Sequence, residues 1–223
     1  MTTPEVHTAQ TRLEFTEEMK GYVTPGESDY DRGFQTGREQ GNFLMFHLTI
    51  KIDDVNRFVA NPRHEATAEG YAQCEALGGT LPVERGVFNL FVDEADPARK
   101  RMLYRLFLRG APTPCAKDEP LTLTGFKEIK DDPGFDIWRD ATTLFTRILR
   151  GHVGAAEEAR AEAVASGIIQ IHPLDFLKQM TTFEVDGPTT VDRAAAFAKF
   201  GKLFLGSLWD VYARDFTASS PRS

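Results

Sequence analysis

Residues 42–52 read NFLMFHLTIKI, and the two-residue alternation in this stretch predicts a β-strand with two unlike faces. One face is entirely apolar and consists of Leu44, Phe46, Leu48, Ile50 and Ile52. The other face begins apolar and ends polar; it consists of Phe43, Met45, His47, Thr49 and Lys51. Because a strand face in contact with water usually carries fewer apolar residues, we expect the mixed face to line an enclosed space.

Four more stretches alternate in the same way and predict further strands. They are GVFNLFV (86–92), RMLYRLFLRG (101–110), LTLTGFKEIK (121–130) and TTLFTRILRG (142–151). Clusters of Gly, Pro and Asp separate them, which is typical of hairpin turns between antiparallel strands. The sequence therefore predicts a mainly β protein, either an antiparallel β-barrel or a sandwich, calycin-like in form, with a C-terminal amphipathic helix.

The predicted helix covers residues 189–215. Thr189 stands three residues before Asp192, as in a capping box, and a helical stripe of apolar side chains follows. The stripe consists of Phe197, Phe200, Phe204, Leu208 and Val211. Charged residues within the helix argue against a membrane span. The helix is either buried in its own domain, the alternative we favour, or docked on a membrane or a partner protein.

One segment departs from the strand pattern. Residues 154–166, GAAEEARAEAVAS, are rich in Ala and Glu and predict a short exposed helix or a mobile insertion. The segments around it contain no linker of low complexity, so we expect a single domain over residues 13–216, with flexible tails at 1–12 and 217–223.

Composition narrows the range of partners and compartments. The chain has 26 basic and 33 acidic residues, a net charge of −7, which argues against nucleic acid unless the basic residues gather on one face. Cys74 and Cys115 are far apart and match no disulfide or zinc pattern, so we expect two reduced thiols. The N-terminal residues do not resemble a signal peptide, and we expect a cytoplasmic protein.

The predicted turn at 131–140 is rich in carboxylates, namely Asp131, Asp132, Asp136 and Asp140. Their spacing does not match that of an EF-hand calcium loop, so we interpret the segment as a structural turn and predict no metal site.

Several of these stretches together resemble a known family. GVFNLFV, KRMLYRLFLRG, LTGFKEIKDDPGFDIWRDATTLFTRILRG and the upstream EFTEEMKGYV are similar to an uncharacterised bacterial β-rich module. That module accompanies flavin oxidoreductases of the glucose–methanol–choline class, the cholesterol-oxidase-like proteins. The similarity covers about residues 13–153. It implies an oxidoreductase partner and a lipid or steroid ligand, but it supplies no catalytic residue.

The flavin domain itself has no counterpart here, since no GxGxxG motif follows a predicted strand, and we expect no cofactor. The GxSxG, HExxH and Walker motifs are also absent from the sequence, so no common reaction class is indicated.

The candidate ligand-binding residues therefore come from strand positions. His47 stands in the middle of the mixed face, where an imidazole can contact an enclosed ligand, and the same reasoning selects other polar or aromatic positions on the predicted strands. The set consists of Met45, His47, Phe91, Tyr104, Phe145 and Arg147. Arg105 and Lys127 also interrupt apolar strands, and each needs a polar partner if it faces inward.

Three functions follow from these features. The first is binding of a bulky hydrophobic small molecule, such as a steroid, a lipid or a polyketide, in an enclosed cavity. The second is a cofactor-free isomerase or cyclase that acts on such a molecule, with His47 or Tyr104 polarising the substrate. The third is an accessory module that docks on an oxidoreductase or a membrane through the C-terminal helix.

Overall fold

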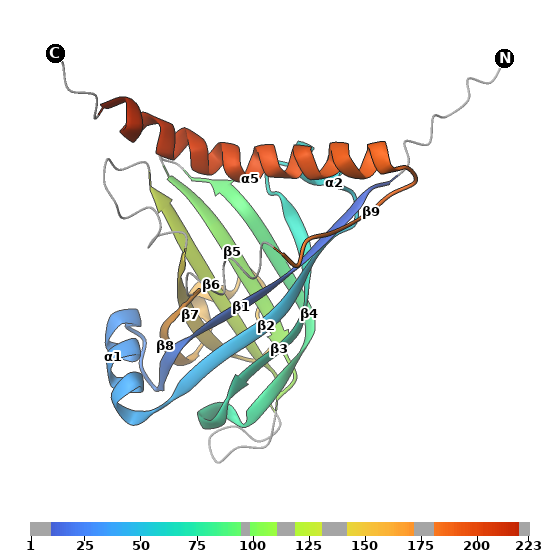
Figure 1. Ribbon diagram of the computed structural model, residues 1–223. Helices are drawn as coiled ribbons and strands as arrows, with labels where there is room; N and C mark the ends of the chain where they lie inside the picture. The colour runs from blue at the N-terminus through green and yellow to red at the C-terminus, as the bar shows by residue number, and fades with distance from the viewer. Residues whose placement is uncertain (1–9, 95–98, 111–118, 131–141, 172–180, 219–223) are drawn as a thin grey trace.

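The computed structural model describes residues 10–94, 99–110, 119–130, 142–171 and 181–218, and for residues 130 and 205–218 it describes the backbone alone. The chain forms a closed eight-stranded antiparallel β-barrel of calycin-like topology with a long C-terminal helix across one end (Figure 1). The strands are β1 (Arg12–Pro25), β2 (Phe43–Ile52), β3 (Glu65–Cys74), β4 (Gly79–Asp93), β5 (Arg99–Leu108), β6 (Leu121–Lys130), β7 (Thr143–Arg150), β8 (Ala163–Gln170) and the short β9 (Glu184–Asp186). The prediction of an antiparallel, mainly β fold is confirmed, and of its two forms the barrel is the one found.

Strand β1 closes the barrel because it pairs with strands from both ends of the sheet. It pairs with β2 from Leu13 to Tyr22, and with β8 from Lys20 to Pro25. At its other end, Arg12 to Glu14 pair with β9 instead of β8. Between the ladder with β8 and the ladder with β9, Thr182 contacts β1. Its hydroxyl accepts a hydrogen bond from the amide of Thr16 at 2.9 Å. We call this stretch, Phe15–Met19, the seam.

The inner and outer faces of the barrel follow the alternation of the strands. In β2 the side chains of Leu44 through Ile52 at every second position are buried inside, as the sequence predicts. The mixed face points outward, so the expectation that it lines an enclosed space is wrong. Its apolar residues are explained by neighbours on the outer wall, since Phe43 contacts Tyr22 with ring centroids 6.0 Å apart.

Three strands of the barrel were not recognised from sequence, namely β1, β3 and β8. In β1 and β3 the inward positions alternate with charged or polar residues, but several of those inward residues are small or polar, which weakens the apolar signal. The prediction of a short helix or a mobile insertion at residues 154–166 is also corrected. This segment contains a short 3-10 helix at Glu158–Arg160, and from Ala163 onward it belongs to β8. Tertiary pairing overrides the helix propensity of this Ala-rich segment.

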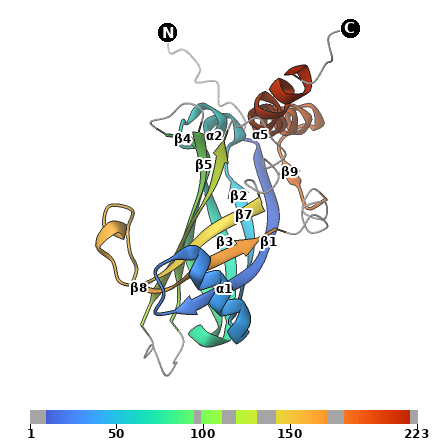
Figure 2. The same ribbon diagram turned by 90° about the vertical axis from the view of Figure 1, so that its left-hand side faces the viewer.

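Among the residues that the structure describes, three α-helices pack on the barrel: α1 (Tyr30–Gln40), α2 (Val55–Ala60) and α5 (Thr190–Ala218). Helices α2 and α5 lie together at one end, and α1 lies on the outer wall near the other end (Figures 1 and 2). The predicted capping box is present, because the amide of Asp192 donates to the Thr189 hydroxyl at 3.1 Å. In the described part of the chain, no helix is long and apolar enough to cross a membrane.

Helix α1 touches the barrel wall through two glycines, Gly33 and Gly37, which are its buried residues. A Cβ atom at Gly33 would lie 2.2 Å from the carbonyl oxygen of Ser166 in β8, and one at Gly37 would lie 2.5 Å from that of Val23 in β1. These distances are far shorter than van der Waals contact. The two glycines therefore allow the helix backbone to rest directly on the two strands that close the barrel.

We expect Gly33→Ala and Gly37→Ala each to lower the free energy of unfolding by about 1–3 kcal/mol, because the added methyl group forces the helix away from the wall. In the exposed interior of a helix the same change stabilises the protein by about 1 kcal/mol. A loss of stability therefore distinguishes a close contact with the wall from an exposed position. Urea denaturation measures the effect, with exposed Gln35→Ala on the same helix as the control. Stabilisation by both glycine variants would contradict the close contact.

Candidate functional site

A network of three polar side chains lies inside the otherwise apolar barrel. Glu17 of β1 accepts a hydrogen bond from the ammonium group of Lys127 in β6 at 2.7 Å, and its second carboxylate oxygen accepts one from the hydroxyl of Tyr104 in β5 at 2.8 Å. All three residues are almost completely buried. The Lys127 nitrogen also lies 5.2 Å from the centroid of the Tyr104 ring. We call these residues the polar network.

The polar network is electrically balanced, since one carboxylate faces one ammonium group. A buried charge without a partner is very costly, and pairing with hydrogen bonds offsets most of that cost. The Tyr104 phenol has no such compensation when ionised. Burial, followed by the neighbouring Glu17 carboxylate, raises the pKa of Tyr104 well above its ordinary value, so this hydroxyl remains a hydrogen-bond donor.

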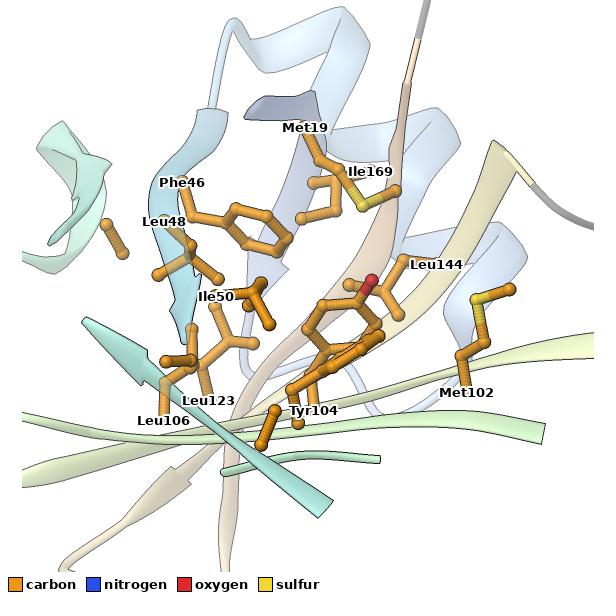
Figure 3. Packing of buried hydrophobic residues seen from close by; sticks show 14 of the residues in the cluster. Met19, Phe46, Leu48, Ile50, Met102, Tyr104, Leu106, Leu123, Leu144 and Ile169 are labelled. Carbon is orange, nitrogen blue, oxygen red and sulfur yellow. The ribbon is translucent and has the colours of Figure 1, made fainter. Parts of the chain in front are cut away.

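An aromatic cluster occupies the space between the polar network and α5. It consists of Phe15, Phe58, Phe88, Phe91, Phe183, Phe200 and Phe204. Tyr104 belongs to the polar network and also contacts the aromatic cluster, because its ring centroid lies 5.0 Å from that of Phe88. Figure 3 shows the Tyr104 ring in the middle of apolar side chains from several strands, with its hydroxyl directed into the barrel.

The two halves of the barrel interior differ in packing. In the half away from α5 the inward side chains have no exposed surface; examples are Met19, Val23, Leu44, Leu81, Leu106, Leu108, Leu123 and Ile148. Toward α5 small exposed fractions of 3–6% appear, at Phe15, Phe88, Met102, Tyr104, Ile129 and Ile171. The small exposed fractions therefore lie toward α5, although Phe91 at that end has none, and the inward side chains of both halves are buried.

Helix α5 closes this end with aromatic side chains. Phe200 is buried against Phe15, with ring centroids 6.1 Å apart, and Phe204 contacts Phe91 at 6.0 Å. Phe91 has a left-handed backbone, with φ of 49°, at an irregularity in the β4–β5 pairing, and this bulge brings its side chain under the helix. Phe197 of the predicted stripe is half exposed, so the part of the helix up to Phe204 is buried on one side; the side chains of Leu208 and Val211 lie outside the described ones.

The six candidate residues from the sequence fall into two groups. Tyr104 and Phe91 lie inside, in the polar network and in the aromatic cluster. The other four lie on the outer wall. His47 is 41% exposed and contacts Glu18, with Met45 beside it on the same outer face, whereas Phe145 and Arg147 both pack against Tyr30 of α1. These four side chains do not line the interior, because the side chains that point inward are those at the alternate positions of each strand.

Two residues of the site were not chosen from sequence as ligand contacts, Glu17 and Lys127. Lys127 was recognised only as a polar residue that needs a partner if it faces inward, and the structure supplies Glu17 as that partner. Glu17 carries a detectable signal: it occupies the same phase as Leu13, Phe15 and Met19, where an acidic residue is out of place. The signal depends on recognising β1 as a strand.

Metal binding finds no support in the part of the chain that is described, since no group of three or more His, Cys, Asp or Glu side chains is suitably placed there. The aspartates of the predicted 131–140 turn lie outside the described residues. Cys74 is a free, buried thiol whose pKa is raised by burial, and Cys115 also lies outside the described residues.

We expect Glu17→Leu and Lys127→Met to lower the free energy of unfolding by about 3–5 kcal/mol each, because each leaves one buried charge without its partner. The double variant removes both charges and should recover most of that loss. Urea denaturation measures all three, with Lys51→Met, in an exposed pair with Glu69, as a control of small effect. Additive losses in the double variant would contradict the coupling.

We expect the free energy of unfolding to fall more steeply above pH 10 in the native protein than in Tyr104→Phe. Below its ordinary pKa of 10.0 the phenol is protonated in both states. Above it, the unfolded chain releases this proton while the folded chain retains it, so stability is lost by up to about 1.4 kcal/mol per pH unit. Denaturation at pH 9, 10 and 11 checks this; equal slopes in both proteins would show that Tyr104 is not buried as described.

Comparisons with protein-family models, with curated proteins and with solved structures each give no match for this chain. The resemblance to the oxidoreductase-associated module, and the partner that it implies, therefore stay predictions from sequence. The function has to be inferred from the barrel and its interior.

Proposed function

We propose that the barrel binds a bulky, apolar and uncharged small molecule under α5, with an oxygen atom of the ligand against the polar network. The observation that carries this proposal is the Glu17–Tyr104–Lys127 network itself. A lysine and a glutamate inside an apolar barrel do not improve its stability over well-packed apolar residues, so a role in recognition explains them better.

The architecture supports the place of binding. Eight-stranded barrels are wide enough for side chains or for one small ligand, and here the half away from α5 is filled by side chains. The other half ends in rings of the aromatic cluster, which suit a flat or branched apolar body. Because Phe200 and Phe204 occupy this end, α5 has to move outward when a large ligand enters.

The charge balance of the polar network selects the chemistry of the ligand. Within the described residues, Lys127 donates one hydrogen bond, to Glu17, and an ammonium group can donate three. A carbonyl or hydroxyl oxygen can accept one of the others. A carboxylate would add a second negative charge beside Glu17 in a site of low polarity, which disfavours fatty acids and favours ketones, alcohols and esters of steroid-like or polyketide-like compounds.

The catalytic alternative is favoured by one observation, because a carboxylate and a phenol in contact are groups that can accept and donate a proton. Tyr104 is placed to act on an enclosed substrate, whereas His47 on the outer wall is not. The docking alternative concerns α5, whose Ala196 and Phe200 are buried in the barrel end, so this half of the helix belongs to the core.

We expect native mass spectrometry of protein purified from its own host to show a one-to-one complex, and denaturing extraction to release an uncharged apolar compound. In vitro, the neutral dye phenylnaphthylamine should bind one-to-one and be displaced by a steroid ketone about tenfold more effectively than by the matching hydrocarbon, as expected for one hydrogen bond to a charged group.

The Glu17→Leu/Lys127→Met double variant should bind the dye but lose the preference for the ketone. His47→Ala, on the outer wall, serves as the control and should behave like the native protein. An empty native protein that also fails to bind the neutral dye would refute the proposal.

A further inference from the structure

A hollow lies on the outside of the barrel, on the other side of the wall from the polar network. It has a volume of about 560 Å³ and lies over β4, β5 and β6, with the segment between β7 and β8 as its side wall. Figure 2 shows this segment standing out from the barrel. The volume falls in the range of small-molecule sites, which is roughly 300–1,000 Å³. We call the hollow the arginine groove, after Arg63, Arg85, Arg101 and Arg105, which line it.

The arginine groove is positively charged in a protein whose net charge is −7. Its lining contains these four guanidinium groups and one carboxylate, that of Glu158. Arg105 is paired with Glu158, and Arg101 lies between Glu94 and Glu128. For Arg63 and Arg85, no acidic partner occurs among the residues that the structure describes. These two guanidinium groups are the ones available to an anion.

Two of the arginines are held flat by aromatic rings. The guanidinium carbon of Arg85 lies 4.2 Å from the ring centroid of Phe107, and that of Arg101 lies 4.7 Å from that of Phe126. Such stacking restrains the guanidinium group, and in Arg85 the N–H groups can then donate in pairs to a carboxylate, a sulfonate or a phosphate, whereas those of Arg101 are engaged by Glu94 and Glu128. A mobile surface arginine loses more conformational entropy on binding.

The walls of the arginine groove are held in place by hydrogen bonds. Arg105 donates to the carbonyl oxygen of Val153 at 3.0 Å and pairs with Glu158, so it ties the outer segment to the barrel. Asn89 is buried and donates to the carbonyl oxygen of Arg63 at 3.0 Å, which fixes the chain at the rim. The groove is therefore a formed cleft rather than a gap between side chains.

The floor of the arginine groove is apolar. Val87 and Leu103 are half-buried, and the edge of Phe126 continues this surface. An inorganic anion would leave it uncovered. A ligand that joins an anionic group to a flat apolar body would contact both the floor and the arginines.

We propose that the arginine groove binds a small organic anion, a carboxylate, sulfonate or phosphate attached to a flat apolar body, with Arg85 and Arg63 as the groups that receive its charge. The closed side wall and the negative charge of the rest of the protein argue against a nucleic-acid strand. This site is independent of the uncharged ligand proposed for the barrel interior.

Two dyes with the same ring system test the proposal. Anilinonaphthalene sulfonate carries the anion, and phenylnaphthylamine lacks it. We expect the sulfonate to bind one-to-one with an affinity that decreases as salt is added, and Arg85→Ala and Arg63→Ala each to weaken it about tenfold, as for loss of a charged hydrogen bond. Arg32→Ala, on the exposed side of α1, is the control and should leave binding unchanged.

The outcomes separate the two sites. Loss of sulfonate binding in the two groove variants, with phenylnaphthylamine binding retained, supports the arginine groove. Sulfonate binding that survives both variants, or is lost in the Glu17→Leu/Lys127→Met variant instead, overturns it and assigns the dye to the interior. Absence of saturable sulfonate binding to the native protein also overturns it, whatever the neutral dye does.

Discussion

The contact between Glu17 and Lys127 is the constraint on which the interior depends. It joins β1 to β6 across the inside of the barrel, through two residues that are 110 positions apart in the sequence. A shift of either strand by one residue would turn its charged side chain outward and leave the other buried alone. The pair therefore fixes the phase of both strands, and with them the choice of which side chains form the core. Tyr104 extends this constraint to β5 through its own hydrogen bond to Glu17.

The barrel brings two chemically opposite environments onto the two sides of one wall. Tyr104 of β5 points into a mainly apolar interior whose two charges balance, while Arg105, the next residue, lines a cationic groove outside. Alternation along a strand is sufficient to produce this contrast, because neighbouring residues point to opposite faces. One short strand thus contributes side chains to both of the proposed binding sites, one on each side of the wall.

Sequence patterns predicted the strands whose inward residues are large, such as β2, with Leu44 through Ile52, and β5. They did not predict β3, whose inward residues are mainly alanines, or β8, whose Ala-rich start has helical propensity. The site was predictable only in part, because its members depend on which face is inside. Tyr104 was a candidate whose face the sequence left open, and it lies inside, whereas His47 was expected on an enclosed face and lies on the outer wall, where contacts explain its apolar neighbours. Glu17 could not be selected without β1, which was not recognised as a strand and one of whose partners, β8, is distant in sequence.

The seam at Phe15–Met19 makes the two sides of β1 unlike. On one side β1 pairs with β2 without interruption from Leu13 to Tyr22, in a ladder whose hydrogen bonds are each worth about 1 kcal/mol. At the seam, β1 has left β8 and has not yet met β9, and the contact with Thr182 stands in for a ladder among the described residues. Glu17 lies in the middle of this stretch. The carboxylate at the centre of the polar network therefore stands on a strand position with two kinds of neighbour: Leu48 of β2 in a continuous ladder on one side, and on the other the chain at Thr182, which holds β1 through a side-chain hydroxyl.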